Sequence, residues 1–535
     1  MTTPAKFSSS KFVRLFLFLA CVATLYSLPL HAQEPRGRIG DPGAGGIEAE
    51  NASRIARIES DVAAYPVGPG QAPLHFTLQQ LMAQFHDPGL SVAVVDHFQI
   101  VWTKAYGVVA TGSDVPVTTK TLFQAGSISK PVAATGALYL VEHGKLALDE
   151  DVNKKLITWK VPDNDFTKTE KVTLRRILSH SAGLTVHGFP GYATDATLPT
   201  VPQVLNGEKP ANTAAVRVDF LPGSKVVYSG GGVTIEQQLV MDVTQKPFPQ
   251  FMKEVVLDKI GMTDSTYEQP LPAALASRAA TGTYPDGKSV VGKWHVYPEM
   301  AAAGLWTTPT DLAKFGIEIA KSKHGNSNLV LSESMTRQML TAQIENAALG
   351  FFLAPDNADR FAHGGADEGF QAMFVMLGDE GQGAVVMTNS DNGINVANHL
   401  IESIASEYHW KFEHEKPPAG EVLRVLADKK GTQAALQEYA ELKKNSASGY
   451  EFNEGDLNLM GYALLNQKKF DEAIAALKLN VEMYPNSGNV YDSLGEAYMD
   501  AGQKDLAIQN YEKSLQLDPK NENAVTMLKK LKDQK

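Results

Sequence analysis

The sequence predicts a body of mixed α/β (α+β) class followed by an all-α repeat array. Two observations predict the body: β-rich runs occur at 90–95 and 99–104, and similar runs return only at 369–377 and 383–388. Between them lie mostly helical patterns and long loops rich in Pro and Gly. A sheet assembled from both ends of a domain, with helices inserted in the middle, fits this order. A repeat period near the C-terminus predicts the array.

Length and composition agree with more than one folded unit. The 535 residues exceed what one hydrophobic core normally supports. With 43% hydrophobic and 20% charged residues, the chain is neither disordered, collagen-like nor a polytopic membrane protein. The formal net charge of −11 argues against a nucleic-acid partner.

Residues 1–32 resemble an export signal. Basic residues at Lys6, Lys11 and Arg14 precede an apolar run over 15–30, and Ala32 provides a small residue for cleavage. We therefore expect a periplasmic or secreted protein without a stable membrane span. The alternative is an uncleaved signal that anchors the protein in the membrane, although the run is marginal for a span.

Cleavage after Ala32 would leave a mature chain without cysteine, because Cys21 is the only one. This excludes disulfides, thiolate catalysis and cysteine metal sites. The thirteen histidines form no His-Glu-x-x-His or comparable cluster, so we expect no metal and no cofactor.

Four segments follow from these patterns. Residues 33–70 read as a flexible leader with a short helix over 52–63, and 71–415 form the main body. The Pro-rich stretch at 416–420 separates this body from the repeats, which we place at 416–535.

The repeats are indicated by small or helix-breaking residues that recur with a spacing of 34. Gly461, Ala463, Ala473 and Pro485 return as Gly495, Ala497, Ala507 and Pro519. This period resembles the two-helix tetratricopeptide repeat, and an unrelated pair of helical hairpins is the alternative. Residues 422–443 could supply a first, degenerate repeat, and 523–532 could cap the array. We expect the exposed helical surface to bind a protein or to shape access to a cleft.

The segment Ser127-Ile-Ser-Lys130 begins an apolar helical pattern that ends near Gly144. Residues three apart on a helix share one face, so the amine of Lys130 can lie beside the hydroxyl of Ser127. A desolvated lysine can act as the base that activates a serine nucleophile. The Ser127 N–H has no helical partner in the first turn and could bind an oxyanion. The same spacing at Ser8 and Lys11 belongs to the signal.

Five segments resemble, in order, the landmarks of the penicillin-recognising serine hydrolases. They are Phe123-Gln-Ala-Gly-Ser-Ile-Ser-Lys130, Val172-Thr-Leu-Arg-Arg-Ile-Leu-Ser-His-Ser-Ala-Gly-Leu184, Pro222-Gly-Ser-Lys-Val-Val-Tyr-Ser-Gly230, Ala303-Gly-Leu-Trp-Thr-Thr-Pro-Thr-Asp-Leu-Ala313 and His363-Gly-Gly365. The subgroup they resemble comprises class C β-lactamases, D-alanyl-D-alanine carboxypeptidases and related esterases. The resemblance covers roughly 71–410. It implies an antiparallel sheet flanked by helices with an inserted helical domain, and an acyl-serine mechanism without cofactor.

The resemblance also implies roles for individual residues. Ser127 matches the nucleophile, Lys130 its neighbouring lysine and Tyr228 the tyrosine of the Tyr-x-Asn element, which acts as base and then as acid. His363 and Gly365 match the element on the strand edge. Ala366, the next residue, would donate the second oxyanion N–H from its backbone. Phenol and ammonium favour each other's charged form, so this pair should titrate as a unit.

Two departures from the family pattern bear on the substrate. Gly230 stands where the family has asparagine, so the amide that holds the acylamino group is missing. His363 replaces the lysine of the lactamases, and a neutral imidazole binds a carboxylate more weakly than an ammonium does. Both changes favour an esterase or a D-amino-acid peptidase over an efficient β-lactamase.

Each site residue also has a structural interpretation. Tyr228 could be a half-buried aromatic before a turn, and His363 a strand-edge residue without a chemical role. We interpret His180 as structural, and Asn389 and Asp391 as residues that form turn hydrogen bonds.

The function that follows is an exported serine hydrolase acting on an ester, peptide or β-lactam-like carbonyl of a small-molecule or peptide substrate. The alternative is a catalytically silent envelope binding or scaffold protein that uses the repeats.

Overall fold

The computed structural model describes residues 44–66, 72–411, 416–445 and 449–533. The export signal expected at 1–32 lies outside the described residues. The chain divides into two compact units, one from Met1–Ser60 with Leu78–Phe412 and the other from Asp61–Thr77 with Glu413–Lys535. We refer to them as the body and the repeat unit.

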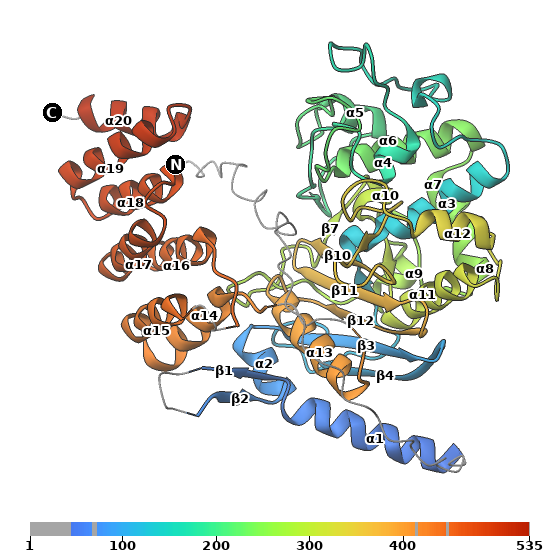
Figure 1. The fold of residues 1–535 in the computed structure, drawn as a ribbon, viewed down its shortest axis with the longest axis horizontal. Helices are drawn as coiled ribbons and strands as arrows, with labels where there is room; N and C mark the ends of the chain where they lie inside the picture. Colours follow the sequence, from blue (N-terminus) through green and yellow to red (C-terminus); the bar gives the residue numbers. More distant parts are fainter. Residues whose placement is uncertain (1–43, 67–71, 412–415, 446–448, 534–535) are drawn as a thin grey trace, which may run out of the picture. The chain divides into compact units, whose positions relative to one another are not determined.

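The body is built on a six-stranded antiparallel sheet of order β4-β3-β12-β11-β10-β9 (Figure 1). The strands are β3 (Gly89–Asp96), β4 (Gln99–Gly107), β9 (Phe352–Leu353), β10 (Arg360–Asp367), β11 (Phe370–Leu377) and β12 (Gln382–Thr388). The central contact joins β3 to β12, which lie at opposite ends of the body's sequence. The expectation of a sheet assembled from both ends of the domain is therefore confirmed.

The β3–β4 hairpin turns at His97 and Phe98, which both have positive φ angles of 48° and 61°. Two successive residues of this kind give the turn whose twist matches that of the flanking strands. The Phe98 N–H also donates to the carbonyl of Gly381 at 2.9 Å, which ties the turn to the neighbouring β11–β12 connection.

Helices cover both faces of the sheet. Ala93 and Val95 of β3 belong to the main hydrophobic core, whereas Val92 and Val94 are equally buried outside that core. Side chains alternate between faces along a strand, so neither face is left to solvent. Helices α11 (Pro309–Lys323) and α13 (Gly393–Glu407) both contact the sheet.

The long insertion between β4 and β9 is largely helical and carries the candidate site. Its elements are β5 (Phe123–Gln124), η1 (Gly126–Ile128), α3 (Ser129–Glu142), η2 (Val152–Lys154), α4 (Leu174–Leu178), β6 (Tyr192–Ala193), α5 (Val201–Asn206), α6 (Gly230–Thr244), α7 (Phe248–Met252), the π-helix η3 (Lys253–Leu257), α8 (Asp258–Ile260), α9 (Ala273–Ala276), β7 (His295–Val296), α10 (Met300–Ala303), β8 (Trp306–Thr307), α11 and α12 (Glu333–Met339). An antiparallel sheet flanked by helices with an inserted helical region is thus the observed architecture.

Two helices precede the sheet in the body. Helix α1 (Ala44–Ser60) begins earlier and ends earlier than the helix expected over 52–63. It contacts α13 and α2 (Leu78–Gln84), and Arg57 forms an ion pair with Glu407 at 2.5 Å. This part of the expected leader therefore packs on the body.

The repeat unit contains seven helices among its described residues. They are α14 (Ala419–Lys430), α15 (Thr432–Lys444), α16 (Glu454–Asn466), α17 (Phe470–Met483), α18 (Gly488–Asp500), α19 (Lys504–Leu517) and α20 (Glu522–Asp533). The small residues of the period explain the close packing within each pair. A β-carbon on Gly461 would lie 2.6 Å from Leu477, and one on Gly495 would lie 3.1 Å from Tyr511.

The repeat unit also includes a short β-hairpin from the N-terminal part of the chain. Strand β1 (Ala63–Tyr65) pairs antiparallel with β2 (Leu74–Phe76). Tyr65 is buried, packs edge-on against Phe76 and donates its hydroxyl to Glu421 of α14 at 3.2 Å. Residues expected in the leader and at the start of the body thus pack with the repeats.

Within the described residues, none of the helices is both long enough and apolar enough to span a bilayer.

Candidate active site

Ser127 and Lys130 lie at the start of the central helix α3. The chain enters through the 3₁₀ turn η1, which contains Ser127, and α3 begins two residues later. Helix α3 ends near Gly144, as the sequence predicts. Gly144 has a φ angle of +66°, which is typical of the glycine that follows the C-terminus of a helix. The Nζ of Lys130 donates to the Oγ of Ser127 at 2.8 Å and to the carbonyl of Ala302 at 2.7 Å. The structure therefore places amine and hydroxyl in direct contact.

Lys130 is buried, with 4% of its surface exposed. Burial lowers the pKa of Lys130 from 10.5 to about 7, while the nearby carboxyls of Asp367 and Glu236 oppose this shift. A substantial fraction of the amine is then unprotonated near neutral pH. In that form the same contact can be reversed, with the Ser127 hydroxyl donating to the amine.

Tyr228 lies close to both Ser127 and Lys130. It precedes α6, whose N-cap Ser229 accepts a hydrogen bond from Gly232 N–H. The Nζ of Lys130 lies 4.9 Å from the centre of the Tyr228 ring. Burial raises the pKa of Tyr228, and its hydrogen bond with Ser127 opposes that rise. The three residues expected to form a catalytic group are therefore brought together.

His180 packs against the ring of Tyr228. The imidazole lies 4.3 Å from the Tyr228 ring, centre to centre, and its Nδ1 accepts from the backbone N–H of Ser229 at 3.2 Å. Burial, together with Lys130 and His363, holds the pKa of His180 well below its ordinary value. The structure thus gives His180 a packing position against Tyr228.

His363 is a buried, neutral imidazole. It is 4% exposed, and its Nδ1 lies 2.6 Å from the carbonyl of Gly364, so the proton resides on Nδ1. Burial and the nearby Lys130 lower the pKa of His363 to about 3. Both effects favour the neutral form of this ring near neutral pH.

The strand-edge element packs tightly on the turn that carries Ser127. Among the described strands, β9 pairs with β10 only at Phe361 and Ala362. Beyond these residues, β10 contacts η1 near Gly365 and Ala366. A β-carbon on Gly365 would lie 1.9 Å from the carbonyl oxygen of Ala125. One on Gly126 would lie 2.4 Å from the amide nitrogen of Ala366. Glycine is required at both positions for this approach.

Gly230 has a steric role in this chain. A β-carbon at Gly230 would lie 2.9 Å from the ring of Phe189, and the Gly230 N–H donates to the carbonyl of His187. The loop that contains Phe189 therefore occupies the space that an asparagine side chain would need. An aromatic ring replaces the missing amide at this end of the site.

Three buried carboxyls lie around the site: Glu236 on α6, Glu299 before α10 and Asp367 on β10. Burial raises the pKa of Glu236 and of Glu299 to about 8, and the pKa of Asp367 well above its ordinary value. These residues were not expected from the sequence.

Asn389 and Asp391 form hydrogen bonds with the backbone. The Nδ2 of Asn389 donates to the carbonyls of Val109 and Thr281, both at 3.0 Å, and Asp391 accepts from the N–H of Gly369 at 2.7 Å. These bonds reach backbone groups of distant segments, so the prediction that both side chains form turn hydrogen bonds was wrong.

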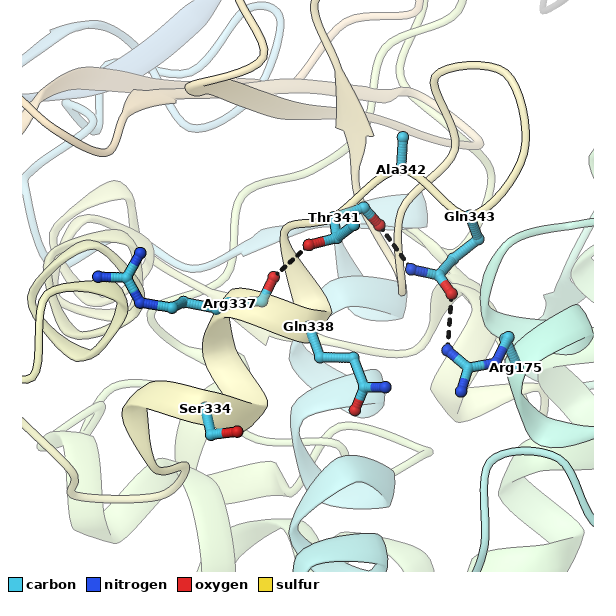
Figure 2. A pocket seen from close by; sticks show the side chains of 7 residues that line it. All are labelled: Arg175, Ser334, Arg337, Gln338, Thr341, Ala342 and Gln343. Atoms are coloured by element: carbon cyan, nitrogen blue, oxygen red, sulfur yellow. Dashed lines mark hydrogen bonds between the residues drawn. The ribbon is translucent and has the colours of Figure 1, made fainter.

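The body also contains an open hollow of about 520 Å³. Figure 2 shows the side chains that line it. Its lining consists of Arg175, Ser334, Arg337, Gln338, Thr341, Ala342 and Gln343. Arg175 donates to Gln343 at 2.7 Å within this hollow and also pairs with Asp149. The lining includes none of the three residues of the candidate site.

Comparison with known proteins identifies the family. The model of the β-lactamase family matches residues 77–408, more than half of the chain. The chain belongs to the β-lactamase family. The expected membership of the β-lactamase-related family is confirmed. Tetratricopeptide repeat models match residues 457–487 and 488–521, which confirms the expected array.

The relatives of this β-lactamase-family chain are distant. A "Beta-lactamase" of Pseudomonas fluorescens is 29% identical over 242 residues, covering 45% of this chain and 62% of that protein. "Penicillin-binding protein 4" of Amycolatopsis lactamdurans is 24% identical over 351 residues, covering 61% of this chain and 87% of the relative. The octameric penicillin-binding protein homologue from Pyrococcus abyssi has a TM-score of 0.50 at 19% identity, covering 69% of this chain and 78% of that chain. This last likeness shows the fold alone.

Proposed function

We propose that the body is a serine hydrolase that forms an acyl-enzyme on Ser127. The observation that carries this proposal is the buried amine of Lys130, with a pKa of about 7, at 2.8 Å from the hydroxyl of a partly exposed serine. A serine hydroxyl becomes an effective nucleophile only when a neighbouring base removes its proton.

The proposed reaction has two halves. Lys130, with the phenol of Tyr228 beside it, takes the Ser127 proton as Oγ attacks the carbonyl carbon. The backbone N–H groups of Ser127 and Ala366 stabilise the oxyanion. The leaving group then departs with a proton delivered through Tyr228. In the second half, water attacks the carbonyl carbon of the acyl group and gives its proton to Tyr228 and Lys130. The acyl group then leaves Ser127, whose oxygen takes a proton back to regenerate the hydroxyl.

The substrate class follows from the charge of the site. Neutral His363 offers no cation for a substrate carboxylate, and Phe189 occupies the space of the amide that would hold an acylamino group. Both features favour esters or peptides with an uncharged, apolar acyl portion. We therefore propose an esterase or D-amino-acid peptidase in preference to an efficient β-lactamase.

We also propose that the protein is exported and that its repeats bind a protein partner. The basic, apolar and small-residue pattern of 1–32 supports export to the periplasm or beyond. Stacked helix pairs expose an extended surface that suits protein binding.

The test compares wild-type protein with Ser127→Ala. A fluorophosphonate probe should label the wild type only, and hydrolysis of a p-nitrophenyl ester should be lost in the variant. A chromogenic cephalosporin and a D-Ala-D-Ala peptide, assayed in parallel, rank the substrate classes. Wild-type protein that behaves like Ser127→Ala would instead support the silent binding protein.

A further inference from the structure

The ring of Phe352 lies in direct contact with the aromatic residues of the candidate site. It lies 6.3 Å from the ring of Tyr228, centre to centre, and the two planes are inclined by 26°. It lies 5.8 Å from the imidazole of His180, with an angle of 10° between the planes, and 5.7 Å from that of His363. Phe352 therefore extends a group of nearly parallel rings that begins at His180 and Tyr228.

The hydrophobic core does not account for this ring. Phe351 and Leu353, on either side of Phe352, are buried and belong to the main core, whereas Phe352 is only partly buried and lies outside that core. Strand β9 is the last strand of the six-stranded sheet, and Phe352 pairs there with Ala362. Successive side chains of a strand point to opposite faces, so Phe352 points away from the core and toward the site.

The position of Phe352 relates it to one end of the site. It contacts His363, whereas Phe189 lies at the opposite end, beside Gly230, where the acyl portion of a substrate was placed above. In the proposed reaction Tyr228 delivers a proton to the leaving group. A partly exposed ring that stacks on Tyr228 at the His363 end is therefore in reach of the leaving group and away from the acyl portion.

We infer that the exposed part of the Phe352 ring binds the leaving group of the substrate, and that this group is a planar, aromatic alcohol or amine. The inference rests on the proposed function and names the substrate class of the same site. Aromatic rings prefer offset-stacked or edge-to-face contacts with centroids 4.5–7 Å apart, which is the spacing already present in this group.

The charges at this end of the site agree with an uncharged ring. Burial holds the pKa of His180 and of His363 below the ordinary value, so neither imidazole offers a positive charge to a carboxylate. A leaving group that carries a carboxylate would find no cation on these rings. An apolar aromatic group loses nothing by their neutrality.

The experiment uses two esters with the same acyl group. Benzyl acetate and cyclohexylmethyl acetate have leaving groups of similar size, one planar and one saturated, and both form the same acetyl-enzyme. The measured quantity is the ratio of their kcat/KM values, followed by release of acetate. In Phe352→Leu the preference for the benzyl ester should fall by about two- to tenfold, because the aromatic contact is lost. Phe352→Tyr keeps a ring and should keep the preference.

Phe189→Leu is the matched control, since it replaces a partly buried ring at the acyl end. It should leave the ratio unchanged, whatever its effect on both esters together. An unchanged ratio in Phe352→Leu, or an equal fall in Phe189→Leu, would overturn the inference. If Phe352→Leu folds poorly, Phe352→Met takes its place with the same expected result.

Deacylation separates binding of the leaving group from support of Tyr228. The leaving group has departed once the acetyl-enzyme forms, whereas Tyr228 is needed in both halves of the reaction. Acetyl-enzyme formed with p-nitrophenyl acetate should therefore decay at the same rate in wild type and Phe352→Leu, as quenching and intact mass spectrometry would report. Slower decay in Phe352→Leu would show that the ring acts through Tyr228, which contradicts the inference.

A further measurement is independent of turnover. Benzyl alcohol should receive magnetisation from Ser127→Ala protein in a saturation-transfer NMR experiment. Adding Phe352→Leu should reduce this signal by about twofold or more, and adding Phe189→Leu should not. A signal that Phe352→Leu leaves unchanged refutes the inference even if neither ester is hydrolysed. Failure of the acyl-enzyme proposal is detected separately, by the absence of fluorophosphonate labelling.

Discussion

The α-carbon of Gly365 lies against the carbonyl oxygen of Ala125, so closely that a β-carbon would stand 1.9 Å from that oxygen. This contact joins strand β10 to the turn that presents Ser127. The distance between Ser127, the proposed nucleophile, and the Ala366 N–H therefore depends on a position that accepts only glycine.

Gly365→Ala should separate β10 from the Ser127 turn and remove one oxyanion donor from its place. Loss of one such donor typically costs about 10² to 10³ in kcat. The measurement is kcat for the p-nitrophenyl ester in protein that retains its circular dichroism spectrum. Gly188→Ala is the control, because a β-carbon there meets nothing within 4 Å. Equal activity of Gly365→Ala and wild type would contradict the assigned oxyanion geometry.

Restoring the family's asparagine should harm this protein. In Gly230→Asn the new side chain collides with the Phe189 ring, and overpacking of this kind costs about 1–3 kcal/mol. Adding Phe189→Ala should recover part of this loss, which a double-mutant cycle on the free energy of unfolding detects. Strictly additive effects of the two substitutions would show that the ring does not exclude asparagine.

Activity should depend on pH through Lys130. The active form is the free amine, so kcat/KM should rise with pH, pass its midpoint near the Lys130 pKa of about 7, and then level off. Lys130→Arg keeps a permanent positive charge and should lower kcat/KM by about 10² to 10⁴. A profile that is flat between pH 5 and 9 would assign the base to another group.

Glu299 should weaken the fold at alkaline pH. Its pKa is raised from 4.5 to about 8, so the folded state retains a proton that the unfolded state has lost between these values. Stability contributed by this group is complete below 4.5 and is lost as pH rises through 8. The Tm advantage of Glu299→Gln over wild type should thus grow from pH 5 to 8 and remain constant above. An advantage that does not change with pH would show that the carboxyl ionises equally in both states.

Removing the repeats should expose the β1–β2 hairpin. A chain that ends at Lys411 keeps Tyr65 and Phe76 but loses Glu421 and the helices with which they pack. We expect ester hydrolysis to persist while the truncated chain aggregates more readily, as light scattering would report. Adding Tyr65→Ser and Phe76→Ser should reduce the aggregation. Loss of esterase activity in soluble truncated protein would show that the body needs the repeats.

The sequence was sufficient to predict the sheet and the contact between Ser127 and Lys130, because β-rich runs and helical spacing are local patterns. Tyr228 could be placed only through the family resemblance, since it lies about a hundred residues downstream. Glu236 carried no signal: it occurs between apolar and polar residues of one helix, and burial there depends on which face meets α10. The hairpin at 61–77 was also not predicted, because strands of three residues beside a Pro/Gly stretch resemble a linker.

The hairpin makes the repeat unit discontinuous along the chain. The chain passes between the body and the repeat unit at three points. Two of them are the ends of Asp61–Thr77, and the third follows Phe412, where the C-terminal helices begin. A protease that cuts only at that last junction would leave the two fragments associated, because β1 and β2 would still hold the severed helices. The nicked protein should therefore elute as a single species until a denaturant releases the fragments.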